Sequence, residues 1–241
     1  LKVNPHGNVT VADDVVLDGG TTQPAIYLEG GEVTLYGTAT SKGGYAITTQ
    51  GLNEHNTVIT IKDGATVTAE NGAAIYNPKG DLIIEGGTIT GKIGVQICAG
   101  TLSISGNAQI TATGAAETHE GDGPVFDGSA VSIIDREGYA GLTSVEITGG
   151  TFTSANGTAI RAFAYNDKTE SAFDNSAKVV AISGGTFSGE IEASLLKDGY
   201  KLIEVNGAYG VIEKLILGAS VTLGEDISFN YYVKTKTDNT V

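Results

Sequence analysis

The chain has 241 residues, of which 40% are hydrophobic, and its 28 acidic residues outnumber its 14 basic ones to give a net charge of −14 at pH 7. Such an acidic chain argues against nucleic acid as a partner, because phosphate contacts need clustered Lys and Arg. No apolar run approaches the length of a membrane span, about 20 residues, so no membrane insertion is expected.

Residues 1–24 contain the short apolar runs VTV and VVL, and they predict an irregular first coil. From residue 25 to residue 189 the chain repeats one phrase, in which an aliphatic residue is followed by a glycine turn and a second short strand. Its versions ITGGTFTS, ISGGTFSG, IEGGTITG, LEGGEVTL, IKDGATVTA and ISGNAQITA begin at Ile147, Ile182, Ile84, Leu28, Ile61 and Ile104. Repeats of about 20 residues indicate a solenoid, in which each unit buries its apolar face against its neighbours.

Apolar and polar residues alternate with a period of two in each repeat, which is typical of strands. The inward pairs of the first strand are Ile59 and Ile61, Leu82 and Ile84, Leu102 and Ile104, Val145 and Ile147, and Val180 and Ile182. A second strand is centred on Val33, Val67, Ile89, Ile110, Phe152 and Phe187. A third strand carries Ala46 and Ile47, Ala74 and Ile75, Gly94 and Val95, and Ala159 and Ile160.

Three short strands and three corners in about 20 residues predict one coil of an all-β parallel β-helix. An antiparallel β-sandwich is the competing fold, since it also has many short strands separated by turns. Two columns of equivalent residues favour the β-helix. Glu29, Lys62 and Glu85 would place opposite charges side by side. The second column carries hydroxyls and consists of Thr34, Thr68, Thr90, Thr111, Thr153 and Ser188.

The C-terminal part of the chain departs from the repeat. Residues 190–216 predict a cap over the last coil, with a short helix in IEASLLKDG ended by Gly199 and a β-hairpin turning at Asn206 and Gly207. Such a cap would cover the unpaired edge of the last coil. Residues 217–241 show a new alternation, which predicts the truncated start of a following β-domain or a linker.

The GGTF phrases, a short acidic helix ending in Gly-Tyr and a strand pair occur together in ISGGTFSGEIEASLLKDGYKLIEVNGAYGVI. This combination resembles modules of large secreted or wall-attached surface proteins of Gram-positive bacteria. The resemblance covers roughly residues 25–216, and it implies a right-handed parallel β-helix of the pectin-lyase-like kind, located outside the cell. It says little about activity, because glycines and core aliphatics build the coil whatever the coil does.

No catalytic residues are predicted. Glycoside hydrolysis uses two carboxyls about 5 to 10 Å apart, which on a coil requires acids in one outward column. The outward column of the first strand reads Tyr27, Thr60, Ile83, Ser103, Glu146 and Ala181. Asp13 and Asp14 are similar to the Asp-Asp pair of polygalacturonases, but the other phrases of that family are missing from the sequence. We interpret them as polar residues that end a strand.

No cofactor is predicted, and the candidates for metal binding are weak. His6, His55 and His119 lie far apart in the chain, and we interpret them as solvated loop residues. The run THEGDG offers oxygen ligands for Ca²⁺, with Glu120, Asp122 and Asp127 as the candidates. This run lacks the alternating spacing of an EF-hand loop, so the other interpretation is a solvated acidic loop.

Two longer segments, 111–144 and 161–178, interrupt the repeats, and we expect them to form surface loops in which recognition occurs. The candidate binding residues are Tyr76, Arg161, Phe163, Tyr165 and Asp167. Aromatic rings beside polar groups either stack on sugar rings or pack beneath long loops, and both alternatives stay open. Repeated Thr-x-Thr spacings also resemble the threonine arrays of ice-binding β-helices, although Glu32 and Gln109 interrupt them.

These patterns predict a noncatalytic extracellular β-helix, secreted or attached to the cell wall. It would act as a rigid spacer or ligand-display surface in an adhesin-like protein, as a monomeric unit within a larger chain. Its possible partner is a glycan or another host or cell-surface ligand. The alternative is a β-helix that binds carbohydrate or acts on polysaccharides.

Overall fold

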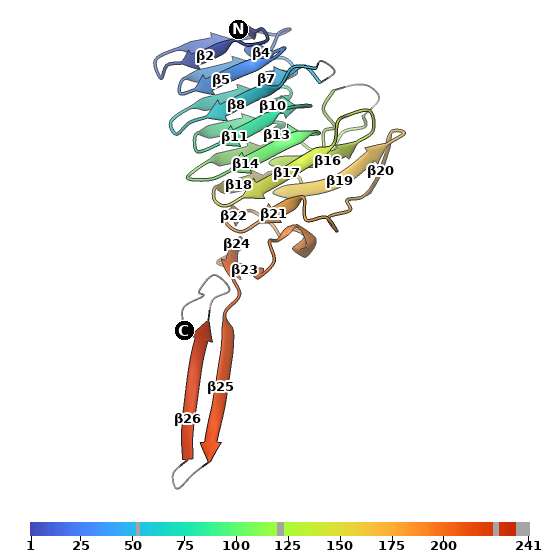
Figure 1. Cartoon of the computed structure of the whole chain (residues 1–241). Coiled ribbons are helices and arrows are strands. Elements are labelled where there is room, and N and C mark those ends of the chain that lie inside the picture. Colours follow the sequence, from blue (N-terminus) through green and yellow to red (C-terminus); the bar gives the residue numbers. More distant parts are fainter. Residues whose placement is uncertain (52–53, 120–122, 224–226, 235–241) are drawn as a thin grey trace.

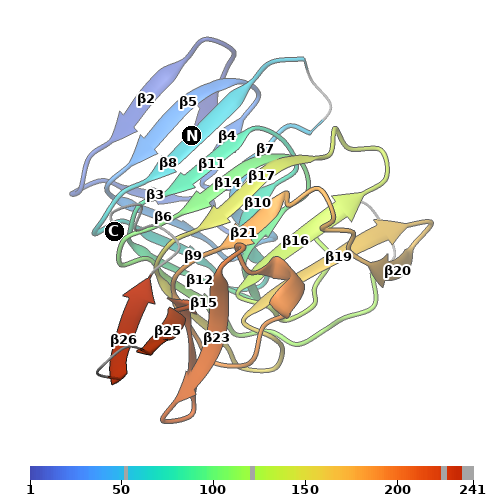
Figure 2. The same cartoon turned by 60° about the horizontal axis from the view of Figure 1, so that its bottom comes forward.

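The computed structural model describes residues 1–51, 54–119, 123–223 and 227–234. Figure 1 shows a stack of short strands that begins at the N-terminal end, with a separate hairpin beyond its far end. The chain is all-β, and three sheets of mostly parallel strands surround a common interior (Figure 2). This arrangement is consistent with a parallel β-helix, and it contradicts the β-sandwich.

We name the three sheets A, B and C and give their strands in spatial order. Sheet A consists of β1 (Lys2–Val3), β4 (Ile26–Leu28), β7 (Tyr45–Thr49), β10 (Ala73–Asn77), β13 (Ile93–Ile97), β16 (Val131–Arg136), β19 (Ile160–Asn166) and β20 (Thr169–Ala172). Sheet B consists of β2 (Asn8–Val11), β5 (Gly31–Leu35), β8 (Thr57–Ile61), β11 (Asp81–Ile84), β14 (Gly100–Ile104), β17 (Leu142–Ile147) and β21 (Val180–Ile182). Sheet C consists of β3 (Val16–Asp18), β6 (Thr38–Ser41), β9 (Thr66–Ala69), β12 (Thr88–Gly91), β15 (Gln109–Ala112), β18 (Thr151–Ser154), β22 (Thr186–Phe187), β24 (Ala208–Glu213) and β23 (Tyr200–Val205).

The residues predicted to point inward from the first strand lie in sheet B, where they form one wall of the interior. Strand pairing places each of them above its counterpart in the next strand, and all are buried. One column of this wall consists of Leu35, Ile61, Ile84, Ile104, Ile147 and Ile182. Complete burial of such side chains stabilises the fold by about 1.5–3 kcal/mol each. On the sheet C side, Phe152 and Phe187 stack with ring centroids 5.1 Å apart.

The structure corrects the alignment of the first repeat. Val33 lies in β5 of sheet B opposite Ile59, and the position predicted for it in sheet C is occupied by Ala39, which pairs with Val67. The cause is that glycine corners join A to B as well as B to C. Gly31 at an A-to-B corner and Gly87 at a B-to-C corner both have positive φ, at 78° and 86°. A glycine phrase therefore marks a corner without showing which corner it is.

The predicted columns change accordingly. Lys62 and Glu85 form the expected ion pair at 2.6 Å, and the hydrogen bond to Glu85 raises the pKa of Lys62. Glu29 belongs to the end of a sheet A strand and pairs with Lys2 instead, at 2.8 Å. The hydroxyl column begins with Thr40 rather than Thr34, which pairs with Thr60 in sheet B.

Both segments predicted as insertions contribute strands to sheet A. Segment 111–144 contains β16, which pairs in parallel with β13 and β19. Segment 161–178 contains most of β19 and all of β20, which form an antiparallel hairpin. Only part of each predicted insertion therefore leaves the stack. The largest excursion lies between β15 and β16, where residues 113–119 and 123–130 are described, and we call this segment the covering loop.

The cap at the end of the stack is a hairpin without an α-helix. The predicted helix is only a 3-10 turn, η1 (Ala193–Leu195), and Leu196 after it is extended because it bridges Ile182 of the last sheet B strand. The hairpin is confirmed: β23 and β24 are joined by Asn206 and Gly207, both with positive φ. Strand β24 pairs with β22 and covers the edge of sheet C.

Beyond the cap, β25 (Ile216–Leu223) and β26 (Ile227–Lys234) pair with each other in antiparallel fashion. In Figure 1 this hairpin extends away from the stack. None of the helices in the described part of the chain has the length and apolar character needed to cross a bilayer.

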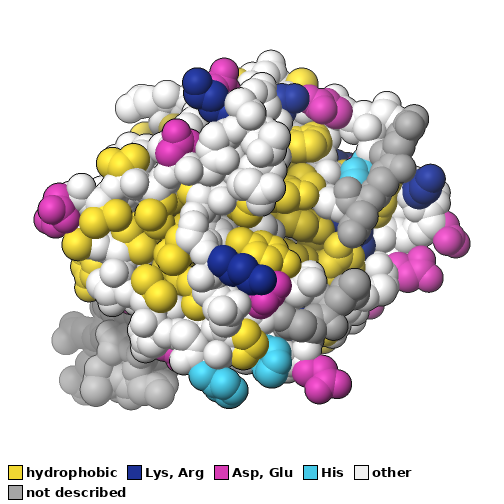
Figure 3. Space-filling model, turned by 90° about the horizontal axis from the view of Figure 1, so that it is seen from above, with side chains coloured by type: hydrophobic (Ala, Val, Ile, Leu, Met, Phe, Trp, Pro, Cys, Tyr) yellow, Lys and Arg dark blue, Asp and Glu magenta, His cyan; other side chains and the backbone are white. Residues whose placement is uncertain are grey.

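Apolar side chains reach the surface at the N-terminal end of the stack. Leu1 and Val16 are 43% and 66% exposed, and Val16 belongs to the edge strand β3 of sheet C. Figure 3 looks onto this end and shows hydrophobic side chains across it, with charged side chains mainly near the rim. The interior is therefore less covered here than at the hairpin-capped end.

Candidate functional site

A second apolar cluster lies on the outer side of sheet A, apart from the interior. The covering loop folds over this side and contributes Val125 and Phe126 to the cluster. Its buried members are Ala73, Tyr76, Ile93, Cys98, Val125, Ile134, Phe163 and Tyr165. Cys98 is thus the small core residue that its apolar neighbourhood indicates. Sheet A is therefore the sheet with an apolar layer on each of its faces.

Hydrogen bonds between side chains and backbone hold the covering loop in place. The buried Gln96 amide donates to the Val125 carbonyl at 2.8 Å and accepts from the Val125 N–H at 2.9 Å. Lys92 pairs with Glu117 at 2.7 Å, and its ammonium lies 5.5 Å from the centre of the Phe126 ring. Because Gln96 satisfies both backbone groups of Val125, the loop can cross the apolar cluster without leaving these two groups unpaired.

Arg136, at the end of β16, ties the covering loop to the aromatic residues. It is 9% exposed, donates to the Gly123 carbonyl and lies 3.4 Å from the Tyr76 hydroxyl. Its guanidinium also lies 3.2 Å from Nε2 of His119 and over the rings of Tyr139 and Tyr165. His119 is therefore part of a side-chain network, which corrects its interpretation as a solvated loop residue.

A tyrosine-lined groove lies beside this network, and we call it the tyrosine groove. One part of the groove, which extends to Tyr139, is a hollow of about 430 Å³. It is lined by Tyr27, Tyr45, Thr48, Thr49, Gln50, Gly51, Tyr76, Pro78, Gly123, Glu137, Gly138 and Tyr139. A second hollow, of about 420 Å³, shares three of these residues. It is lined by Leu1, Lys2, Gln23, Pro24, Tyr27, Tyr45 and Thr48. The shared residues make the two hollows one continuous groove along the outer side of sheet A.

Three of the four tyrosines in the groove are fixed by contacts with one another. Tyr45 stacks on Tyr76 with ring centroids 5.4 Å apart and an interplanar angle of 20°. The Tyr76 hydroxyl hydrogen-bonds to the Tyr139 hydroxyl at 2.9 Å. Burial raises the pKa of Tyr76 far above its usual range, with Cys98 and Tyr139 adding to the effect, so the phenol stays neutral. The groove thus presents neutral aromatic surface with hydroxyl groups at its edge.

The structure brings some of the predicted binding residues together. Tyr76 lines the tyrosine groove, whereas Phe163 and Tyr165 are 3% and 7% exposed within the outer cluster. Of the two alternatives for aromatic rings, stacking on a sugar or packing beneath a loop, these two rings show packing beneath a loop. Arg161 stacks on Phe163 at 4.5 Å and pairs with Glu170. Asp167 is exposed in the β19–β20 turn, with a φ of 50°.

Three of the groove tyrosines were missed by the sequence reasoning: Tyr27, Tyr45 and Tyr139. The strand pairing aligns Tyr27, Thr48 and Tyr76 at one outward position of sheet A, so a correct alignment of the first repeat would have revealed Tyr27. Tyr139 follows β16, and its segment had been assigned to an insertion. No sequence signal connects it to the groove.

Asp127 is buried rather than solvated. Its Oδ1 accepts hydrogen bonds from the Ser129 N–H at 3.0 Å and the Ser132 hydroxyl at 2.6 Å. Its Oδ2 has no hydrogen-bond partner among the described residues, and Arg161 Nη1 lies 3.9 Å away from it. Desolvation raises the pKa of this carboxyl despite those interactions. The other two calcium candidates, Glu120 and Asp122, lie outside the described residues.

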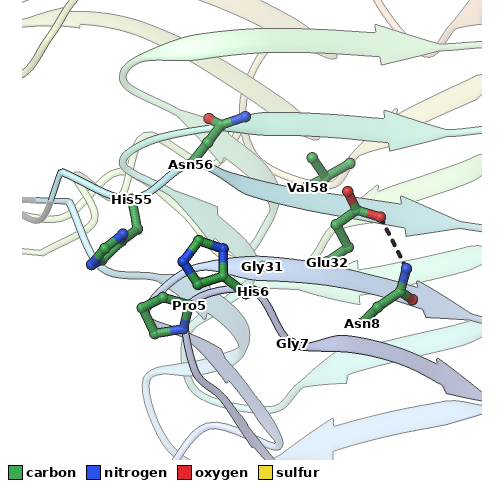
Figure 4. Close-up of a pocket in the computed structure, with 9 residues that line it drawn as sticks. All are labelled: Pro5, His6, Gly7, Asn8, Gly31, Glu32, His55, Asn56 and Val58. Carbon is green, nitrogen blue, oxygen red and sulfur yellow. Dashed lines mark hydrogen bonds between the residues drawn. The ribbon is translucent and has the colours of Figure 1, made fainter.

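His6 and His55 lie close together, although they are far apart in the chain. Figure 4 shows them at a hollow of about 320 Å³ lined by Pro5, His6, Gly7, Asn8, Gly31, Glu32, His55, Asn56 and Val58. Their ring centroids are 6.1 Å apart in an edge-on arrangement. Glu32 points away from both rings and accepts from Asn8 at 3.3 Å. Within the described ranges, no group of three or more His, Cys, Asp or Glu residues is placed to hold a metal ion.

The outward column of sheet B is corrected by one residue. Thr34 replaces Tyr27 at its start, and the column then reads Thr34, Thr60, Ile83, Ser103, Glu146 and Ala181. Glu146 is its single acid, so this column does not supply the two carboxyls of a glycosidase. Asp13 and Asp14 are exposed in the turn between β2 and β3.

Comparison with known proteins yields no relative. No protein-family model matches the chain, and neither the curated proteins nor the solved structures give a significant match. The resemblance to GGTF-repeat surface modules therefore stays a prediction.

Proposed function

We propose that this chain is a noncatalytic extracellular module, a rigid spacer and ligand-display surface within an adhesin-like cell-surface protein. The observation that supports it best is the in-register stacking of three sheets around one apolar interior. Strands about 4.8 Å apart, each bonded to the next, give a rod whose length grows with every turn. We further propose right-handed winding, because crossovers between parallel strands are right-handed in about 98% of cases.

The outer surface of each sheet has a different character. Sheet A carries the tyrosine groove and its covering loop, sheet C presents two columns of threonines, and the hollow beside His6 and His55 borders the first strands of sheet B. A spacer needs only the stack, whereas a display surface also needs one place where a ligand is held. The tyrosine groove is the place that we assign to this role.

The noncatalytic part of the proposal is tested by activity assays on the intact chain. Plant and bacterial polysaccharides, including polygalacturonate, are incubated with the protein and followed by reducing-sugar and unsaturated-uronate assays. We expect no turnover above that of heat-denatured protein. Sustained turnover would overturn the proposal and favour the alternative of a polysaccharide-active β-helix. For the cellular location, protease treatment of intact producing cells should remove the module.

The corrected columns on sheet C favour one second candidate, an ice-binding surface. The sequence alignment placed Glu32 in one of these columns, but the strand pairing puts Thr38 at that position. Gln109 is then the one residue that interrupts the two threonine columns. They consist of Thr38, Thr66, Thr88, Thr151 and Thr186, and of Thr40, Thr68, Thr90, Thr111 and Thr153. Their hydroxyls have no protein partner among the described residues. Measurable thermal hysteresis, lost in Thr90→Tyr and kept in Thr60→Tyr on sheet B, would support this candidate.

A further inference from the structure

We propose that the tyrosine groove binds an uncharged oligosaccharide, with sugar rings against Tyr27 and Tyr45 and a sugar hydroxyl bonded to Thr48. This inference rests on the proposed display function and names the chemical class of its ligand. It is carried by the shape of the groove, by one hydroxyl that opens onto it without a protein partner among the described residues, and by the charges around the groove.

The aromatic surface of the groove is suited to sugar rings. Tyr27 and Tyr45 line both hollows and are partly exposed, and Tyr45 is held in place by its stack on Tyr76. Flat apolar rings with a polar edge are amphipathic in the same way as a pyranose, which has an apolar face and a hydroxyl rim. Because Tyr76 is anchored through Tyr139, the platform is formed before a ligand arrives, and less ordering entropy opposes binding.

Thr48 provides the most specific indication of a ligand. The residue is only 5% exposed and lines both hollows, yet its hydroxyl has no hydrogen-bond partner among the described residues. Its neighbour Thr49, by contrast, donates to the Lys79 carbonyl at 2.9 Å. Among the described residues, Asp127 Oδ2 is the one side-chain atom that is both fully buried and unpaired, so the Thr48 hydroxyl opens onto the groove and is satisfied there by water or by a ligand. Its place between Tyr27 and Tyr45 suits a sugar hydroxyl that replaces the water.

The charges around the groove favour an uncharged ligand. Lys2, at one end, is already paired with Glu29 at 2.8 Å. Arg136 is buried behind the rings, where it donates to the Gly123 carbonyl and contacts His119. Glu137 lines the other end and is exposed. A uronate or sialylated glycan would therefore meet a carboxylate without gaining an available cation, in a chain of net charge −14.

The size of the groove sets the length of the ligand. Each hollow, at about 430 Å³ and about 420 Å³, falls within the range of small-molecule sites. Because the two hollows share Tyr27, Tyr45 and Thr48, a ligand that fills both passes directly over these residues. The ligand is thus a short oligosaccharide with neighbouring sugar units in the two hollows, rather than a single sugar.

The test is a glycan array probed with the whole 241-residue chain, followed by calorimetric titration of the strongest neutral oligosaccharide. Tyr45→Ala should weaken binding roughly tenfold or more, since an aromatic contact is lost. Thr48→Val, which keeps the shape and removes the hydroxyl, should weaken it by about three- to tenfold. The matched controls are Tyr36→Ala, an exposed tyrosine outside the groove, and Thr60→Val on sheet B, which should bind as the parent does.

The outcomes separate this inference from the proposed function. Thermal unfolding of each variant shows whether it is folded. If Tyr45→Ala does not fold, the binding measured for Thr48→Val still decides the test. Binding that is unchanged in Tyr45→Ala and Thr48→Val, binding of uronates or oligolysine alone, or no binding at all would overturn the groove assignment and leave the spacer intact. Cleavage of a bound neutral oligosaccharide would overturn the noncatalytic proposal and leave the groove assignment standing.

Discussion

The outer faces of sheets A and C are built from the same turns of chain, but they differ in almost every other respect. Sheet C shows two columns of partly or fully exposed hydroxyl residues, while sheet A has large and varied residues beneath the covering loop. The outward column of sheet A reads Tyr27, Thr48, Tyr76, Gln96, Ser132 and Arg161. Inward residues maintain the stack in both sheets, so the outward residues are free to diverge.

This difference indicates which kind of surface on a stacked β-structure can form a binding site. A uniform column offers every turn the same environment, whereas a varied column together with a covering loop produces a hollow with its own chemistry. Outward residues on sheet A should therefore matter for stability and for binding of a ligand, whereas those on sheet C should matter little for stability. The following predictions test this contrast.

The largest effect is expected from Phe163→Ala in the outer cluster. Phe163 is 3% exposed and carries Arg161 on its ring, so truncation leaves a cavity that costs about 3–5 kcal/mol. Urea unfolding of the variant and its parent measures this free energy. A loss below about 1 kcal/mol would mean that the outer cluster contributes no real packing.

Gln96→Leu should release the covering loop. It leaves the N–H and carbonyl of Val125 without partners, at a cost of about 1–3 kcal/mol for each group that stays buried. We expect faster amide exchange at Val125 and faster proteolysis within residues 113–130. The control is Gln109→Leu on sheet C, where the side chain is exposed and no such change is expected. Equal protection of the loop in both variants would contradict the role given to Gln96.

Asp127→Asn should change how stability depends on pH. Burial raises the pKa of Asp127 in the folded state, so the folded chain holds this proton more tightly than the unfolded chain does. Its contribution to the free energy of unfolding is therefore greatest at acid pH, and it is lost as pH rises from the unfolded pKa of about 3.9 through the folded pKa. Each tenfold difference in proton affinity corresponds to about 1.4 kcal/mol.

The Asn variant lacks this titration. Its stability relative to the parent should rise between pH 3.5 and pH 7, as measured by denaturant unfolding at several pH values. Glu146→Gln, which removes one exposed carboxylate of sheet B, is the matched control for the loss of a single charge. A parallel pH profile for Asp127→Asn and the parent would show that Asp127 is not desolvated.

The smallest effect is expected on sheet C. Thr90→Val and Thr111→Val keep the β-branched shape and remove hydroxyls that have no protein partner among the described residues. The free energy of unfolding should change by no more than about 0.5 kcal/mol. A loss of more than about 1 kcal/mol in thermal or urea unfolding would show that the hydroxyl columns stabilise the stack.

The core could be predicted from the sequence more fully than the site. Ile59, Leu82, Leu102 and Val145 were assigned to the interior from their period of two, and all of them are buried. The position of Val33 could not be obtained in this way, because the glycine corner before it has the same signature as corners elsewhere. The 190–199 segment was predicted as a helix from the spacing of its apolar residues, although contact with the last turn of the stack keeps Leu196 extended.

The site was predicted only through Tyr76. Phe163 and Tyr165 belong to its neighbourhood, but the covering loop buries them, and a loop path cannot be obtained from alternation. Tyr27 and Tyr139 line the same hollow of the groove, although they are far apart in the sequence. The two residues come close together only because each turn of chain stacks in a particular register on the previous one. That register depends on every inserted segment between them.

The amino-acid sequence by itself determined the strands, their inward residues and the places where the chain turns, because these depend on local alternation and on the backbone freedom of glycine. The tertiary structure decided which corner each glycine forms, which outward column is covered and where the tyrosine groove lies. These features depend on how far each turn of chain travels before it stacks, and that distance is set by packing between residues that are remote in sequence.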